Sequence, residues 1–303
     1  MSGYVHFPPI AVEAKALHLT GEIEERPEGY AGPNLAPTGV RMVPLQLGEG
    51  VFALLAQPMP RDNIGVVFGS KATLVIDAGI TPSVGRIIQG KVRELTDRAI
   101  HFLVNTTYHG DHTFGNAAFA PDVHIVSSRL NAVSMVDLEK EKRTRSRNMY
   151  GDRALEEVTE WRKPDLIFEH FMEIDLGGRT VQLWQFGPGN GPGDTIVYVP
   201  SARAAWTGNF LGHRGVAPML LEGAPRPYIG SLMRMKDTLD ELTTIIPGHG
   251  PIDHGAEPID WVAVAGIPAE TRAGLQRLNR EMDRLNVLST YREFERAGIE
   301  HER

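Results

Sequence analysis

Residues 105–116 read N-T-T-Y-H-G-D-H-T-F-G-N and follow directly on the run H-F-L-V of residues 101–104. Three side chains of metal-ligand type stand close together in this stretch: His109, Asp111 and His112. Imidazole and carboxylate groups suit a borderline divalent cation such as zinc. The three cannot share one helix face, so we expect the chain to leave a strand and turn sharply at Gly110, which lets them converge. A polar loop with two incidental histidines is the plain alternative, and motifs elsewhere decide between the two.

The stretch resembles the signature of the metallo-β-lactamase superfamily, H-x-H-x-D-H within N-T-H-x-H-G-D-H-T-x-G-N. Four further landmarks stand in that family's order: L-V-I-D-A-G (74–79), which contains Asp77, then G-N-G-P-G-D-T (189–195), T-G-N-F (207–210) and P-G-H-G (247–250). The resemblance covers residues 64–250. It implies an α/β fold, a four-layer αββα sandwich in which two facing mixed sheets carry helices on their outer sides.

One of the family's two metal sites has lost most of its ligands in this sequence. In the family, that first site takes the first two histidines of the signature and the histidine of the G-H-T-P-G-D-T segment. The residues at these positions are Thr107, His109 and Asn190. Only His109 has a metal-ligating side chain, so the resemblance implies that the first site is dismantled.

The second site of the family is retained. It takes the aspartate and the last histidine of the signature together with the histidine of P-G-H-G, and all three are present: Asp111, His112 and His249. The aspartate that bridges the two metals in the family is Asn209 here, a neutral amide whose oxygen could ligate weakly.

The resemblance therefore favours one divalent metal, held by the second-site residues. Zinc is the favoured ion, because three protein ligands with open positions for water make up a typical catalytic zinc site. Iron is the alternative, because two histidines and one carboxylate also match the facial triad of non-haem iron(II) enzymes. Loss of the bridging carboxylate weakens the electrostatic hold on a cation, so a metal-free protein remains an alternative, as does a dinuclear one.

The expected reaction is hydrolysis of an ester, thioester or lactone of a small molecule or acyl chain by metal-activated water. His109 and Asp111 are the candidate catalytic residues. Without a first-site metal His109 is free to act as a base, and a purely structural hydrogen-bonding role is the equal alternative. Asp77 is expected to orient a ligand through a hydrogen bond, or to cap the strand. Three further side chains are candidates for the substrate pocket, where an arginine would clamp an anionic group: Tyr108, His213 and Arg214.

Two other classes of function remain open. The wording around the landmarks is similar to that of stand-alone bacterial members, some of which are thioesterases or cyclases acting on polyketide chains. A polyketide-type cyclase, a lyase or a mononuclear iron oxygenase would use the same second-site ligands. A metal-free protein would either catalyse with acid–base residues or only bind its ligand.

Composition limits the partners. The 303 residues carry a net charge of −7 and no basic block, so nucleic-acid binding is disfavoured. Cysteine is absent, which excludes disulfides and thiolate ligands. We read no signal peptide and no apolar stretch long enough to span a membrane, so a cytoplasmic protein with no membrane partner is expected. A small-molecule or acyl substrate is the expected partner, and a homodimer is left open.

Three segments are predicted along the chain. Residues 1–40 form an irregular N-terminal extension, residues 41–255 form the metallo-β-lactamase-fold domain, and residues 256–303 form a helical segment packed on that domain.

Periodicity predicts several elements within the domain. Helical patterns cover residues 81–96, 129–149 and 228–242, and a strand covers residues 168–174. The charged run of residues 139–147 mixes both signs at helical spacing, which is typical of a solvated helix face.

Overall fold

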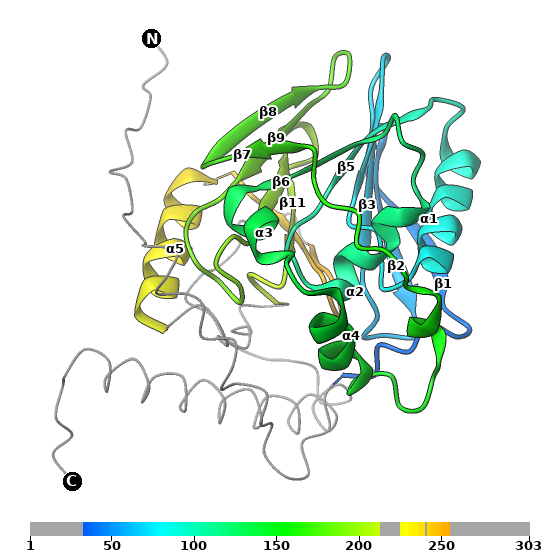
Figure 1. Cartoon of the computed structure of the whole chain (residues 1–303). Coiled ribbons are helices and arrows are strands. Elements are labelled where there is room, and N and C mark those ends of the chain that lie inside the picture. The colour runs from blue at the N-terminus through cyan, green and yellow to red at the C-terminus, as the bar shows by residue number, and fades with distance from the viewer. Residues whose placement is uncertain (1–32, 213–224, 240, 255–303) are drawn as a thin grey trace, which may run out of the picture.

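Two β-sheets lie face to face in the computed structural model, which describes residues 33–212, 225–239 and 241–254 (Figure 1). Within these residues the first sheet has seven strands in the order β1-β2-β3-β4-β5-β6-β7, and the second has six in the order β13-β12-β11-β10-β9-β8. The strands of the first sheet are β1 (Arg41–Gly48), β2 (Val51–Gln57), β3 (Ile64–Phe68), β4 (Thr73–Ile76), β5 (Ile100–Val104), β6 (His124–Ser128) and β7 (Leu166–Phe168). Those of the second are β8 (Phe171–Asp175), β9 (Thr180–Trp184), β10 (Ile196–Val199), β11 (Ala204–Gly208), β12 (Thr244–Pro247) and β13 (Asp253–His254).

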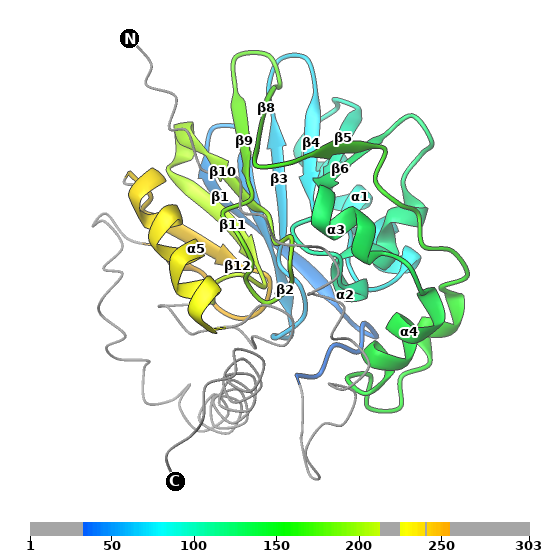
Figure 2. The same cartoon turned by 60° about the vertical axis from the view of Figure 1, so that its left-hand side comes forward.

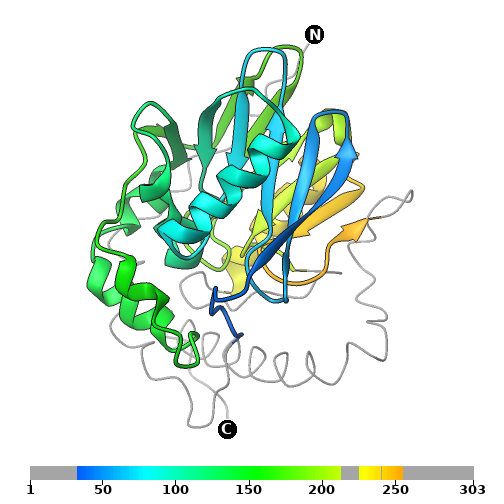
Figure 3. The same ribbon diagram turned by 90° about the vertical axis from the view of Figure 1, so that its right-hand side faces the viewer.

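Helices cover the outer sides of both sheets (Figures 2 and 3). The described α-helices are α1 (Pro82–Leu95), α2 (Gly110–Thr113), α3 (Arg129–Ser134), α4 (Leu138–Ser146) and α5 (Pro225–Thr238). Helix α1 packs on the first sheet and α5 on the second. The four-layer αββα sandwich implied by the sequence is confirmed. None of the described helices is both long and apolar enough to cross a membrane.

The side chains of single strands divide between two apolar layers. In β10 (Ile196–Val199), Ile196 and Tyr198 pack in the layer beneath α5, while Val197 and Val199 pack in the layer between the sheets. Successive side chains of a strand point to opposite faces, so an uninterrupted apolar strand can serve both layers. This is why the inner strands β3, β4, β10, β11 and β12 consist almost entirely of buried residues.

Helix α1 confirms the helix predicted over residues 81–96. The hydroxyl of Thr81 accepts a hydrogen bond from Val84 N at 3.3 Å, which satisfies a backbone donor at the start of the helix. Val84, Ile88 and Val92 then recur at helical spacing and are buried against the first sheet.

Two predicted elements are each divided in the structure. The helix predicted over 129–149 is wrong as one element, because Asp137 caps a new helix by accepting from Lys140 N at 2.9 Å, which separates α3 from α4. The strand predicted over 168–174 is also wrong as one element. Strand β7 pairs with β6 of the first sheet and β8 pairs with β9 of the second, so the chain changes sheets between them.

The terminal segments are described only in part. Residues 33–40 contain no helix or strand, and Leu35 is buried in the layer between the first sheet and its helices. The predictions for residues 1–32 and 256–303 lie outside the described residues. The helix predicted over 228–242 begins earlier, at Pro225, and ends at Thr238.

Two glycines provide a matched test of packing beside α1. A Cβ on Gly115 would lie 1.9 Å from the backbone oxygen of Ala78, whereas a Cβ on Gly90, inside α1, would meet nothing within 4 Å. We expect Gly115→Ala to lower the free energy of unfolding by about 1 to 3 kcal/mol through overpacking. Gly90→Ala should raise it by up to about 1 kcal/mol, because alanine favours the helix. Urea unfolding of both variants measures the difference, and equal stabilities would contradict this packing.

Candidate metal centre

The signature loop, residues 105–116, begins where β5 ends and is closed by its own two end residues. Asn105 Nδ2 donates to Asn116 Oδ1 at 3.0 Å, and Asn116 Nδ2 donates to Asn105 Oδ1 at 2.9 Å. The Asn105 backbone also donates to Val126 O of β6 at 3.0 Å. Both side chains are fully buried and each satisfies the other, so the ends of the loop are fixed and the side chains between them are held in place.

Gly110 has a different role from the one expected. Its backbone is not left-handed, and it begins the one-turn helix α2, which contains Asp111 and His112. A Cβ at Gly110 would lie 2.4 Å from the ring of Phe114. The position therefore requires the absence of a side chain, because the loop packs directly on an aromatic ring.

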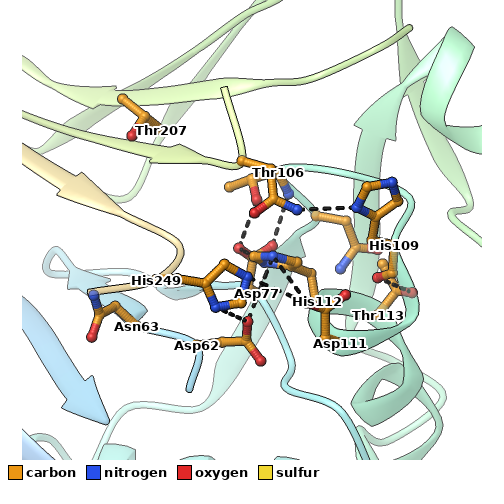
Figure 4. A network of polar contacts seen from close by, with 12 residues as sticks. Asp62, Asn63, Asp77, Thr106, His109, Asp111, His112, Thr113, Thr207 and His249 are labelled. Carbon is orange, nitrogen blue, oxygen red and sulfur yellow. Dashed lines mark hydrogen bonds and ion pairs between the residues drawn. The ribbon is translucent and has the colours of Figure 1, made fainter. Parts of the chain in front are cut away.

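Four side chains converge at the end of this loop: Asp62, Asp111, His112 and His249 (Figure 4). One ligand atom of each lies within 4.8 Å of the others. Asp62 lies two residues before the start of β3, and His249 follows β12 of the second sheet. The three second-site residues implied by the sequence are thus brought together, and Asp62 joins them although the sequence did not suggest it.

Hydrogen bonds orient both imidazoles. His112 Nδ1 lies 2.9 Å from Asp77 Oδ2, and His249 Nδ1 lies 2.8 Å from the backbone oxygen of Pro60. When the ring is neutral, an acceptor opposite Nδ1 places the proton there and leaves Nε2 with a lone pair, as in many metal-ligating histidines. The Nε2 atoms face the cluster: that of His249 lies 3.3 Å from Asp111 Oδ2, and that of His112 lies 3.9 Å from the same oxygen.

Asp77 fixes the position of His112 and of the signature loop through hydrogen bonds. Its Oδ1 accepts from Thr106 N at 2.8 Å, and its Oδ2 accepts from the Thr106 hydroxyl at 2.7 Å as well as from His112. Asp77 has a φ of 65°, a left-handed conformation that is unfavourable for most side chains. The carboxylate is directed at the loop at the expense of local backbone strain, and such strain is concentrated at functional sites.

An ion pair from α4 holds the other side of Asp111. Arg145 donates through a terminal nitrogen to Asp111 Oδ1 at 3.0 Å, and its Nε lies 2.8 Å from Glu141 Oε1. Glu141 also accepts from Gly110 N at 2.8 Å. Burial raises the pKa of Asp111, but the charges of Arg145 and His112 outweigh burial and hold it well below 3.8. The interpretation of residues 139–147 as a solvated face is therefore wrong for Glu141 and Arg145, which are largely buried.

In the metal-free cluster, His112 carries a positive charge because its ring is protonated. Burial lowers the pKa of His112, but three surrounding carboxylates outweigh burial and raise it to about 10. These carboxylates belong to Asp77, Asp62 and Asp111. Burial raises the pKa of Asp62 to about 7, against the opposing charges of His249 and His112. A cation bound here would replace the proton on His112, because a metal-ligating imidazole must be neutral.

His109 lies beside Asn209. The Nδ2 atom of Asn209 is 3.1 Å from His109 Nδ1, and an amide NH₂ can only donate, so Nδ1 accepts and the ring proton resides on Nε2. Burial and the charge of Arg145 lower the pKa of His109 well below 6.5, which keeps the ring neutral at pH 7. The amide nitrogen of Asn209 thus faces His109, and its role as a weak metal ligand stays a prediction.

The other predicted site residues lie around this centre. Thr107 and Asn190 are buried, and the Thr107 hydroxyl lies beside the carboxyl of Asp194. Tyr108 is 7% exposed, and its ring packs edge-on to His109 at 4.6 Å between centroids, so it points into the protein. His213 and Arg214 lie outside the described residues, and their place in a substrate pocket stays a prediction.

Sequence reasoning missed Asp62, Glu141 and Arg145. The family's motifs do not include these positions, and each is distant in sequence from the residue it meets. A weak signal exists for Asp62, because the pair Asp62-Asn63 stands directly before the wholly apolar strand β3. A polar pair at the end of a buried strand must be satisfied by partners from elsewhere in the fold.

Removal of Arg145 should test the ion pair. We expect Arg145→Met to lower the free energy of unfolding of the metal-free protein by about 3 to 5 kcal/mol, because two buried carboxylates lose their cation. Arg143→Met, an exposed position in the same helix turn, should change it by less than about 0.5 kcal/mol. Urea unfolding measures both, and similar effects of the two substitutions would contradict the buried role of Arg145.

Asp194 should make stability depend on pH. Burial raises its pKa to about 6, despite a hydrogen bond from Gly191 N to its Oδ2 at 3.1 Å. A carboxyl whose folded pKa lies above its unfolded value of 3.8 stabilises the fold when protonated, so this contribution disappears as the pH rises from about 4 to about 7. The loss is at most about 3 kcal/mol. Asp194→Asn should flatten the stability–pH curve over that window, whereas the exposed Asp97→Asn should leave it unchanged.

Comparison with known proteins agrees with this architecture. Residues 61–249 match the profile of the metallo-beta-lactamase superfamily. A metallo-beta-lactamase from Pontibacter korlensis has a similar structure, with a TM-score of 0.53 at 15% identity over 71% of this chain and 94% of that one. The DIM-1 metallo-beta-lactamase exposed to ceftazidime gives 0.54 at 14% identity over 71% and 91%, and TMB-1 gives 0.53 at 15% over 84% and 99%. The structural likeness concerns the fold, and the match of more than half of the sequence shows that the chain belongs to the metallo-beta-lactamase superfamily, whose members are generally metal-dependent hydrolases.

Proposed function

We propose that the protein is a hydrolase with a single divalent metal held by Asp111, His112 and His249, acting on an ester, thioester or lactone of a small molecule or acyl chain. One observation carries the proposal. The Nε2 atom of His112 is buried and has no hydrogen-bond partner, and it faces carboxylate oxygens of the cluster. A buried polar atom without a partner is costly, and a cation at this point would satisfy it.

The donor set fits a metal ion. Two donors that are each about 2.1 Å from one ion lie about 3.0 to 4.2 Å apart, depending on the angle between them. The distances from Asp111 Oδ2 to the Nε2 atoms of His249 and His112, 3.3 and 3.9 Å, fall within this range. Two imidazoles and a carboxylate suit zinc, and they also suit iron(II).

Different residues of the chain would position the metal ligands and transfer the proton. When bound, the metal would polarise the substrate carbonyl and lower the pKa of a bound water. Arg145 and Asp77 hold Asp111 and His112 in a fixed geometry, so the site is preorganised. We assign proton transfer to His109, whose neutral ring can take up a proton only at Nδ1, while its Nε2 already carries the ring proton. It accepts through Nδ1 only when Asn209 turns away, since that nitrogen receives the Asn209 hydrogen bond.

A metal-free protein is the second candidate, and the charges of the cluster favour it to some degree. The proton on His112 and the guanidinium of Arg145 already neutralise part of the buried carboxylate charge. In that case His109, Asp111 and His249 would serve acid–base chemistry or ligand binding alone. Metal analysis separates this candidate from the hydrolase.

The metal content of the purified protein is the first test. We expect about one zinc or iron per chain, and its loss in the Asp111→Ala/His249→Ala double variant, because binding depends on the convergent ligands. Wild-type protein that takes up neither metal, even after loading with zinc and iron(II), would sink the proposal.

Turnover of ester, thioester and lactone substrates is the second test. His109→Gln should retain the metal and lower kcat by about 100-fold or more, because glutamine cannot transfer a proton. His101→Gln, at an exposed histidine on β5, is the matched control and should behave as wild type. Loss of activity under anaerobic conditions would instead indicate an oxygenase.

A further inference from the structure

We propose that Asp62 is a fourth protein ligand of the metal centre, and that the centre therefore selects a six-coordinate cation such as manganese(II) or iron(II) for activity. The inference rests on the proposed function, because it concerns the same centre. It adds a ligand that neither the family resemblance nor the sequence motifs supply.

The geometry of Asp62 is that of a ligand. The residue is 4% exposed, and its buried Oδ1 makes no hydrogen bond, although it lies within ion-pair distance of His249 Nδ1, at 3.2 Å. This oxygen lies 3.6 Å from His112 Nε2, the other buried atom of the cluster that lacks a partner (Figure 4). A ligand atom of Asp62 lies within 4.8 Å of those of the other three residues. Asp62 Oδ1 and His112 Nε2 come from different segments of the chain, and neither makes a hydrogen bond. Their closeness is what an ion bound by both would explain.

The backbone fixes this position independently of any metal. Asp62 and His249 form an isolated antiparallel β-bridge, and Asn63 N donates to Gly248 O at 2.7 Å. The Asn63 side chain donates to the backbone oxygens of Pro247 and Gly250 at 3.0 and 2.9 Å. Asp62 and the P-G-H-G loop are therefore one unit, and the carboxyl of Asp62 reaches the centre together with the imidazole of His249.

Charge supports the same assignment. The resemblance implies that a bridging aspartate has been replaced by Asn209, which removes one negative charge from the centre. Asp62 restores that charge from another segment of the chain. Two carboxylates and two neutral imidazoles then balance the charge of a divalent cation.

The number of ligands decides which cation is useful. Zinc prefers four ligands in a tetrahedral arrangement, and four protein ligands leave it no open position, as in structural zinc sites. A cation that takes six ligands keeps two positions, one for water and one for a substrate oxygen. Imidazole suits iron(II) and carboxylate suits manganese(II), so the mixed set is compatible with either ion.

Counting the waters on bound Mn²⁺ tests the assignment without an activity assay. Water-proton relaxation of the Mn²⁺-loaded full-length protein should indicate two exchangeable waters in the wild type and three in Asp62→Ala. A residue that only orients His249 would leave the number unchanged. Asp62→Asn keeps the shape of the side chain. Calorimetric titration with Mn²⁺ should show that its affinity for the ion is at least about 10-fold lower than that of the wild type. The exposed Asp97→Asn, which changes the net charge equally, should match the wild type.

The outcomes separate the two proposals. Asp62 variants with wild-type water number and affinity, beside a His112→Ala variant that no longer binds Mn²⁺, would overturn the role of Asp62 and leave the proposed function standing. A wild type that binds none of Mn²⁺, Zn²⁺ and iron(II) would overturn both. Turnover by the Zn²⁺ form of the wild type equal to that of the Mn²⁺ form would contradict the closed zinc geometry.

Discussion

The carboxylate of Asp77 is the interaction on which the rest of the site depends. It stands at the end of β4 and receives hydrogen bonds from the backbone and hydroxyl of Thr106 and from the ring of His112. One side chain thereby joins a strand end, the signature loop and the first imidazole of the centre. The left-handed backbone of Asp77 is tolerated because these three hydrogen bonds hold a buried charge that would otherwise be unsatisfied.

The fold could be predicted from the sequence because its landmarks are local. Each motif stands at a strand end. The short apolar strands and the amphipathic helices can be predicted from the spacing of their own apolar residues, as α1 shows. Where the prediction failed, a capping side chain or a change of sheet interrupted the pattern, at Asp137 and between β7 and β8. Such interruptions depend on tertiary contacts that a periodicity does not contain.

The centre could be predicted only in the part that the family motifs include. Asp62 and Arg145 meet the signature loop from segments with no motif of their own, and their roles follow from burial and distance. The pair Glu141 and Arg145 resembles any exposed helical ion pair in sequence. Only the packing of α4 against α2 makes it a buried support of Asp111, and charge patterning alone does not reveal that difference.

The lost first site has become a hydrogen-bonded region. Asn209 donates to Nδ1 of His109, and the Thr107 hydroxyl lies beside the carboxyl of Asp194, whose pKa is raised to about 6 by burial. A hydrogen bond to a neutral imidazole therefore occupies the place of one former metal ligand. The substitutions are therefore mutually consistent, since a neutral imidazole with a donor partner replaces a metal ligand.

The centre also lies across the gap between the two sheets. Asp62, Asp111 and His112 are attached to the first sheet, and His249 follows β12 of the second. Elsewhere the sheets are joined largely by apolar packing, with Trp206 among its largest buried side chains. An ion shared by these residues would act as a crosslink between the two halves of the sandwich. The free energy of unfolding would then increase with the concentration of free metal, as in any protein whose native state alone binds its ligand.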